Sequence, residues 1–153
     1  MEITIPARKS WHRVAVRVIA GAGMLAVSSA GAQPLATGGR VIADAGRVRI
    51  AIEVPEALPH RAAIAAGTNV LNIDLPGNVD VHPVVCEGIL ASPAILGCSF
   101  GRLLVGYARL RIVLPGCGTI DESRLIEPLA GEPGQILVDV VYGRPVRCVT
   151  AAS

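Results

Sequence analysis

The chain has 153 residues and a formal net charge of +2 at pH 7. Its first seventeen positions hold four of the fourteen cationic residues, whereas residues 33–153 carry ten arginines against eleven acids. The globular part therefore lacks the concentrated basic field that is typical of nucleic-acid-binding proteins. Its length fits one domain of ordinary size.

The first 32 residues have the organisation of a secretory signal peptide. Their cationic start consists of Arg8, Lys9, Arg13 and Arg17. An apolar run follows at 18–27, and the small residues Ala30-Gly31-Ala32 form a cleavage site. The apolar run is too short to cross a bilayer, which takes about 20 residues. We therefore expect export to the periplasm, with 33–153 as the mature domain and no membrane span after cleavage. The alternative is an uncleaved anchor or an amphipathic surface helix.

Apolar and polar residues alternate with a period of two along the mature domain, which predicts β-strands. The clearest segments are RVRIAIEV at 47–54, VLNIDL at 70–75 and ARLRIVL at 108–114. ILVDVV at 136–141 is apolar on both faces except for Asp139. Weaker strands are expected at 40–44, 60–66 and 79–85. Pro83 makes the last of these an edge strand, because proline cannot donate to a ladder.

The segment from Cys86 to Gly106 fits either a short helix broken at Pro93 or a loop tied by a disulfide. Within it, GCSFG at 97–101 matches the G-x-S-x-G motif of serine hydrolases, with Ser99 as the nucleophile. That fold needs a histidine later in the chain, yet both histidines of the mature domain precede the serine. We therefore interpret 97–101 as a glycine-rich turn and expect no esterase activity.

Four cysteines in an exported chain predict two disulfides. They are Cys86, Cys98, Cys117 and Cys148. Three connectivities are possible, and we favour Cys86–Cys98 with Cys117–Cys148 because sequence neighbours close smaller loops. The alternative for Cys86 is a zinc site with His82, but no C-x-x-C spacing accompanies it. We expect no metal and no cofactor.

Two pairs of segments resemble each other and indicate an internal repeat. RVRI at 47–50 matches RLRI at 109–112, and IDL at 73–75 matches VDV at 138–140. Each half then consists of an arginine-bearing strand followed by an apolar strand with one aspartate. This repeat predicts an all-β sandwich of two similar antiparallel sheets, which bury their apolar faces against each other. Chance similarity between short apolar strands is the alternative.

The segments RVRIAIEVPEALPHRAAIAAGTNVLNIDLPG and ARLRIVLPG…GQILVDVVYG resemble the two halves of an AMIN domain. The resemblance covers residues 38–143, and the four cysteines depart from the family pattern. It implies a non-catalytic module that binds peptidoglycan and targets proteins to the cell wall, ahead of N-acetylmuramoyl-L-alanine amidase or pilus secretin domains. The amidase reaction needs a zinc held by histidines and a carboxylate. The mature domain has only two histidines, so that activity is not expected.

The alternation also places polar side chains on the outer faces of the predicted strands. The candidate ligand-binding residues are Arg47, Arg49, Asn72, Asp74, Arg109 and Arg111. Antiparallel pairing would bring an arginine against Asp74, which has no partner acid or base for catalysis. We expect the arginines to bind stem-peptide carboxylates or muramyl oxygens. The mature domain has only three aromatic residues that could hold a sugar ring, namely Phe100, Tyr107 and Tyr142. We therefore expect binding to rest on polar contacts and to be weak and salt-sensitive.

Two other functions fit the same features. An envelope adaptor would recruit division or other envelope proteins through exposed sheet edges. Alternatively, the chain is the remnant of a longer amidase or secretin. In each case peptidoglycan or an envelope protein is the expected partner, and nucleic acid is not.

Overall fold

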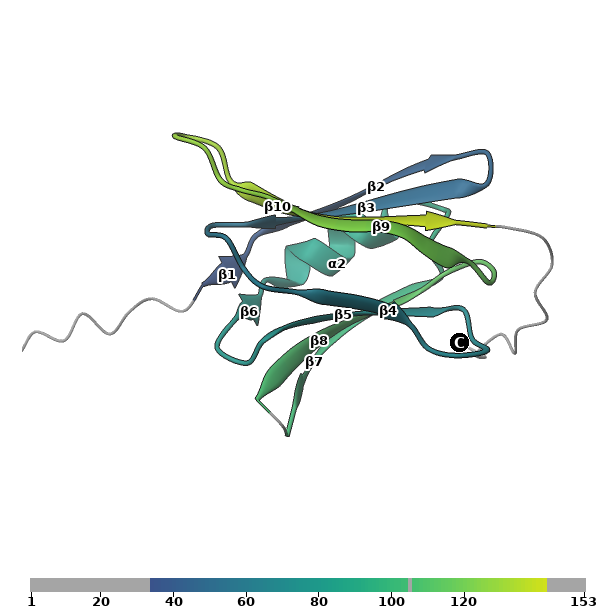
Figure 1. Ribbon diagram of the computed structural model, residues 1–153, viewed down its shortest axis with the longest axis horizontal. Helices are drawn as coiled ribbons and strands as arrows, with labels where there is room; N and C mark the ends of the chain where they lie inside the picture. The colour runs from purple at the N-terminus through teal and green to yellow at the C-terminus, as the bar shows by residue number, and fades with distance from the viewer. Residues whose placement is uncertain (1–33, 105, 143–153) are drawn as a thin grey trace, which may run out of the picture. The chain divides into compact units, whose positions relative to one another are not determined.

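The computed structural model describes residues 34–104 and 106–142 (Figure 1). The expected signal peptide at 1–32 lies outside the described residues. The strands are β1 (Leu35–Ala36), β2 (Gly38–Asp44), β3 (Arg47–Val54), β4 (Arg61–Ile64), β5 (Val70–Pro76), β6 (Asp80–Val81), β7 (Gly97–Leu103), β8 (Tyr107–Val113), β9 (Thr119–Ile126) and β10 (Gly134–Val141). The described part of the chain has one helix, α2 (Pro83–Leu90).

Two four-stranded antiparallel sheets form the body of the fold, which confirms the predicted all-β sandwich. Sheet I has the strand order β2-β3-β10-β9, and sheet II has the order β4-β5-β8-β7. Figure 1 shows the two sheets as separate layers. Each sheet combines one hairpin from the first half of the domain with one from the second. The central contact of each sheet therefore joins the two halves, through β3 with β10 and through β5 with β8.

The core lies between the sheets and is built from the apolar residues of each alternating strand. Its fully buried members include Ile50, Ile52, Leu71, Ile73, Leu75, Leu110, Ile112, Ile136, Val138 and Val140. Burial of one such aliphatic side chain contributes about 1.5–3 kcal/mol relative to exposure. Exposed ion pairs contribute only about 0–1 kcal/mol each. The hydrophobic core therefore stabilises the sandwich, and the outer faces are left available for other roles.

The strand registers show which residues of the two halves are equivalent, and they correct the predicted alignment of RVRI with RLRI. Arg49 lies opposite Asp139 in sheet I, and Arg109 lies opposite Asp74 in sheet II. Arg49 is thus the counterpart of Arg109. The predicted alignment instead matched Arg49 with Arg111. It is wrong by two residues, because the ladder partner of Arg111 is Asn72 and not an aspartate.

The segment 79–85 was expected to be an edge strand, and this is wrong except at β6. α2 begins at Pro83, where proline is well tolerated because a first-turn N–H has no partner within the helix. His82 caps the helix, its Nδ1 accepting a hydrogen bond from the Val84 N–H at 3.2 Å. The helix ends at Leu90, before Pro93. Part of 86–106 is therefore the expected short helix, and the rest contains β7 in place of the expected turn.

α2 lies against two edge strands that belong to different sheets, β2 and β7. On the β2 side, Gly88 packs so closely on Gly39 that a Cβ on Gly88 would overlap the Gly39 carbonyl oxygen. On the β7 side, the Cys86–Cys98 disulfide joins helix to strand, as predicted. The opposite edges of the sandwich, β4 and β9, contact each other directly. No helix in the described part is long and apolar enough to cross a membrane.

Candidate functional site

The six predicted ligand-binding residues lie on two different outer faces. Arg47 and Arg49 are on β3 in sheet I. The other four are on β5 and β8 in sheet II, namely Asn72, Asp74, Arg109 and Arg111. The structure therefore brings together the four predicted residues of β5 and β8, whereas the two arginines of β3 lie on the other sheet. Neither sheet carries all four predicted arginines.

The arginines of β3 are bound within the domain. Arg49 donates from Nε to Asp139 Oδ1 at 2.7 Å and from Nη2 to Oδ2 at 2.6 Å. Asp139 is only 3% exposed, and these hydrogen bonds hold the pKa of its carboxyl below the usual range. Arg47 binds Asp121 at 2.9 Å. Both guanidinium groups are thus engaged with acids of their own sheet.

In sheet II, Asp74 forms the equivalent pair with Arg109. Arg109 Nε lies 2.6 Å from Asp74 Oδ1, and Nη2 lies 2.9 Å from Oδ2. These hydrogen bonds, followed by the charges of Arg109 and Arg61, hold the pKa of Asp74 below its usual range. Asp74 is therefore an ionised, paired carboxylate. This state suits a structural ion pair and does not suit a general acid.

Arg111 differs from the other predicted arginines because no described residue forms a hydrogen bond or ion pair with it. It is exposed on β8 between Asn72 of β5 and Ser99 of β7, which lie opposite it in the two ladders. Both neighbours are uncharged and can donate and accept hydrogen bonds. The three side chains form a polar row, here called the Arg111 row, with one uncompensated positive charge.

The outer faces of the two sheets differ in charge. Sheet I carries both signs, with Arg40, Arg47, Arg49 and Arg124 against Asp44, Glu53, Asp121, Glu122 and Asp139. Among the described outward residues of sheet II, Arg61, Arg109 and Arg111 face a single acid, Asp74. Sheet II therefore presents the positive face of the domain and is the better surface for an anionic ligand.

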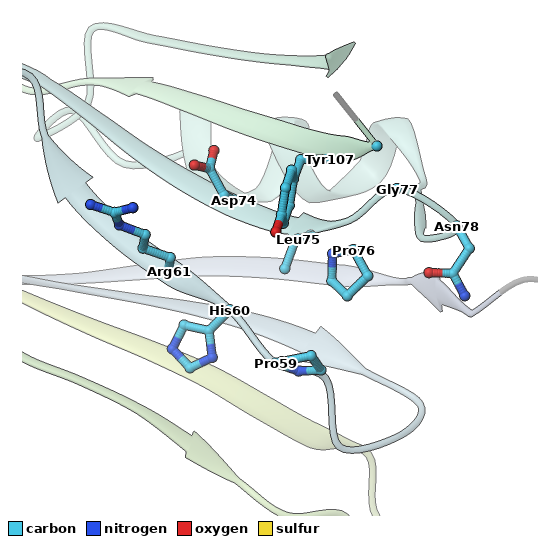
Figure 2. A pocket seen from close by; sticks show the side chains of 10 residues that line it. Pro59, His60, Arg61, Asp74, Leu75, Pro76, Gly77, Asn78 and Tyr107 are labelled. Carbon is cyan, nitrogen blue, oxygen red and sulfur yellow. The ribbon is translucent and has the colours of Figure 1, made fainter. Parts of the chain in front are cut away.

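An open groove lies at one end of sheet II, where β4 begins, β5 ends and β8 begins (Figure 2). This end groove has a volume of about 890 Å³. Its lining comprises Pro59, His60, Arg61, Asp74, Leu75, Pro76, Gly77, Asn78, Gly106 and Tyr107. Pockets of ~300–1,000 Å³ are typical of small-molecule sites. The groove is thus large enough to hold a sugar or a short peptide.

Only Asp74 of the groove lining was predicted as a ligand-binding residue, and three of the other lining residues carry an aromatic or titratable side chain. Tyr107 is 53% exposed and lies opposite Pro76 in the ladder. Arg61 has no ion pair or hydrogen bond with a described residue. His60 Nε2 is hydrogen-bonded to Ser123 Oγ of β9 at 3.0 Å, and burial lowers the pKa of its ring. The groove depends on three separate strand ends, so no local sequence motif could have identified it.

The structure forms neither the serine-hydrolase motif at Ser99 nor the zinc site at His82 and Cys86, which were considered as alternatives from the sequence. Ser99 lies in the middle of β7, not on the strand–turn–helix bend that the G-x-S-x-G motif requires. Cys86 is in a disulfide and His82 caps α2, so the zinc alternative is not formed. Among the described residues no cluster of three or more His, Cys, Asp or Glu could hold a metal ion.

The second predicted disulfide, Cys117–Cys148, involves a residue outside the described ranges. No protein-family model matches the chain, and no curated protein matches it.

Proposed function

We propose that this chain is a non-catalytic, exported AMIN-like module that binds peptidoglycan through the outer face of sheet II and targets the protein to the cell wall. The observation that carries the proposal is the positive charge of this face, where Arg111 has no partner among the described residues. Stem peptides of the wall supply carboxylates, and a guanidinium binds a carboxylate through two parallel hydrogen bonds.

The Arg111 row supports ligand binding more strongly than the paired arginines do. Arg49 and Arg109 each use two nitrogens on an aspartate, so a ligand would have to compete with a bidentate ion pair. Arg111 needs no such exchange. Asn72 and Ser99 can hydrogen-bond amide and hydroxyl groups beside the carboxylate. Arg109 and Asp74 then act as a rigid, neutral pair at the side of the row.

Export is supported by two separate features. The leader at 1–32 has the charge and cleavage pattern of a signal peptide. The Cys86–Cys98 disulfide is typical of a protein that folds in an oxidising compartment such as the periplasm. The two-sheet sandwich with equivalent Arg–Asp pairs is consistent with the repeated halves on which the AMIN resemblance rests.

Cosedimentation of the purified protein with peptidoglycan sacculi tests the proposal. We expect retention at low salt that declines as salt is added, because the contact is exposed and electrostatic. Arg111→Ala should reduce retention by about tenfold, equivalent to one charge-assisted hydrogen-bonded contact. Arg124→Ala on sheet I is the matched control and should bind as the unmodified protein does. Equal retention of both variants would reject the role of Arg111, and absence of retention in the unmodified protein would reject wall binding.

A further inference from the structure

The end groove, counted together with the adjacent Arg109, carries one net positive charge, because Arg61 and Arg109 both lie opposite the single acid Asp74. Asp74 is paired with Arg109. His60 has a pKa lowered by burial and is neutral near pH 7. Arg61 remains as an exposed guanidinium without a described ion-pair partner, at the start of β4. The groove is therefore complementary to a ligand with one negative group, and a carboxylate matches the planar fork of arginine.

The same groove has an apolar wall on which a ring can lie. Tyr107 is half exposed, and Pro76 lies directly across the ladder from it. In Figure 2 the Tyr107 ring stands near Pro76, its ladder partner, while Arg61, His60 and Pro59 extend from the chain that leads into β4. A tyrosine ring provides a large, rigid and amphipathic contact area. The C–H face of a pyranose is a suitable partner for such a ring.

From these two features, we infer that the end groove binds a sugar that bears a free carboxylate, with the sugar ring on Tyr107 and the carboxylate on Arg61. Asn78 lines the groove and offers an amide to ring substituents. This inference rests on the proposed function and specifies its ligand. Muramic acid has the required chemistry when its lactyl carboxylate is not linked to a stem peptide. A stem-peptide carboxylate could satisfy Arg61 but would leave the Tyr107 platform without a sugar ring.

Titration of the ¹⁵N-labelled protein, followed by NMR, separates these ligands. The probes are peptide-free wall glycan fragments, neutral N-acetylglucosamine oligomers of the same length, and the free stem peptide. We expect the peptide-free glycan to shift the amides around Arg61 and Tyr107 and to bind at least about tenfold more tightly than the neutral oligomer, as one charge-assisted contact allows. Equal affinity for the neutral oligomer, or tighter binding of the stem peptide in the groove, would overturn the inference.

Variants test the two named contacts. Arg61→Ala and Tyr107→Ala should each weaken binding of the peptide-free glycan by about tenfold or more, whereas Tyr107→Phe should keep it within about twofold because the ring is retained. Arg40→Ala on sheet I is the control. Unchanged affinity in Arg61→Ala and Tyr107→Ala, with native amide spectra, would refute the groove. If sacculi are retained through Arg111 while these variants have no effect, the groove inference fails and the proposed function stands. If the glycan binds the groove but intact sacculi are not retained, the proposed function fails and the groove inference stands.

Discussion

Arg49 and Asp139 form a bidentate ion pair that has a structural equivalent in the other sheet, between Arg109 and Asp74. Each pair joins a strand from the first half of the domain to a strand from the second. The pairs therefore lie at the two contacts that hold the halves together. The two aspartates differ in environment, since Asp139 is 3% exposed and Asp74 is 21% exposed.

Replacing Asp139 should destabilise the domain, because its carboxylate accepts two charge-assisted hydrogen bonds in a buried position. We expect Asp139→Asn to lower the free energy of unfolding by about 1–3 kcal/mol. The control is Asp121→Asn, since Asp121 also pairs with an arginine but is 51% exposed. That change should cost at most about 1 kcal/mol. Urea unfolding of both variants provides the comparison, and equal losses would show that burial does not strengthen the Asp139 pair.

Acidification should lower the free energy of unfolding. The pKa of Asp139 and that of Asp74 are lowered in the folded state by hydrogen bonds from arginine. An unfolded aspartate titrates near ~3.9, so the unfolded chain binds more protons below that pH. The stabilisation is therefore complete above this value and is lost as the pH falls through the folded pKa.

Protonation of His60 should also lower the free energy of unfolding, and it should do so at a higher pH than protonation of the aspartates. Burial lowers the pKa of its ring, so protonation favours the unfolded chain once the pH falls below ~6.5. Urea midpoints measured from pH 7 to pH 3 should show both phases. His60→Gln should remove the first phase and leave the second, and Asp139→Asn should reduce the second. A stability that rose on acidification would contradict both assignments.

The glycine contact between α2 and β2 predicts a strong local effect. A Cβ on Gly88 would overlap the Gly39 carbonyl oxygen, and backbone cannot move aside as a flexible side chain can. Alanine normally favours a helix over glycine by about 1 kcal/mol. Overpacking costs about 1–3 kcal/mol or more, so we expect Gly88→Ala to be destabilising on balance. Thermal unfolding should show a lower midpoint.

Gly101→Ala is the matched control for this change. No atom lies within 4 Å of a Cβ built on Gly101, and this residue is exposed on β7. Glycine weakens a strand interior by roughly 0.5–1 kcal/mol relative to alanine, so this variant should be neutral or slightly more stable. A destabilised Gly101→Ala variant together with an unaffected Gly88→Ala variant would contradict the packing described for α2.

The strands that alternate strongly were predicted correctly, whereas β9 was missed for a physical reason. Its two inward apolar residues, Ile120 and Leu125, pack against the core. They do not share a period of two, because the ladder with β10 shifts register between Asp139 and Val140. Three of the six exposed residues of β9 are charged, as suits an edge strand. A pattern search based on strict alternation cannot detect such a strand.

The candidate site was predictable only in part. Alternation identified the outward residues of β3, β5 and β8, but it could not show that β3 belongs to a different sheet. Nor could it separate Arg111, which is unpaired among the described residues, from Arg49, which binds a buried aspartate. These distinctions depend on which distant strands pair and in what register. Arg61 was missed, and Tyr107 was noted only as one of three aromatic residues, because the end groove forms only when three strand ends meet.

The Cys86–Cys98 disulfide should stabilise the domain by limiting the unfolded chain. Its cysteines are twelve residues apart, and a loop of this size predicts about 3 kcal/mol. Replacing both residues by serine avoids a reactive free thiol and should lower the urea midpoint. Because the disulfide joins α2 to β7 while glycine packing holds α2 to β2, we expect hydrogen exchange to increase most in α2 and β7. The central strands β5 and β8 are the internal reference, because their exchange follows the loss of global stability alone. Acceleration in α2 and β7 that did not exceed that of β5 and β8 would show that the disulfide has no additional local effect on the helix.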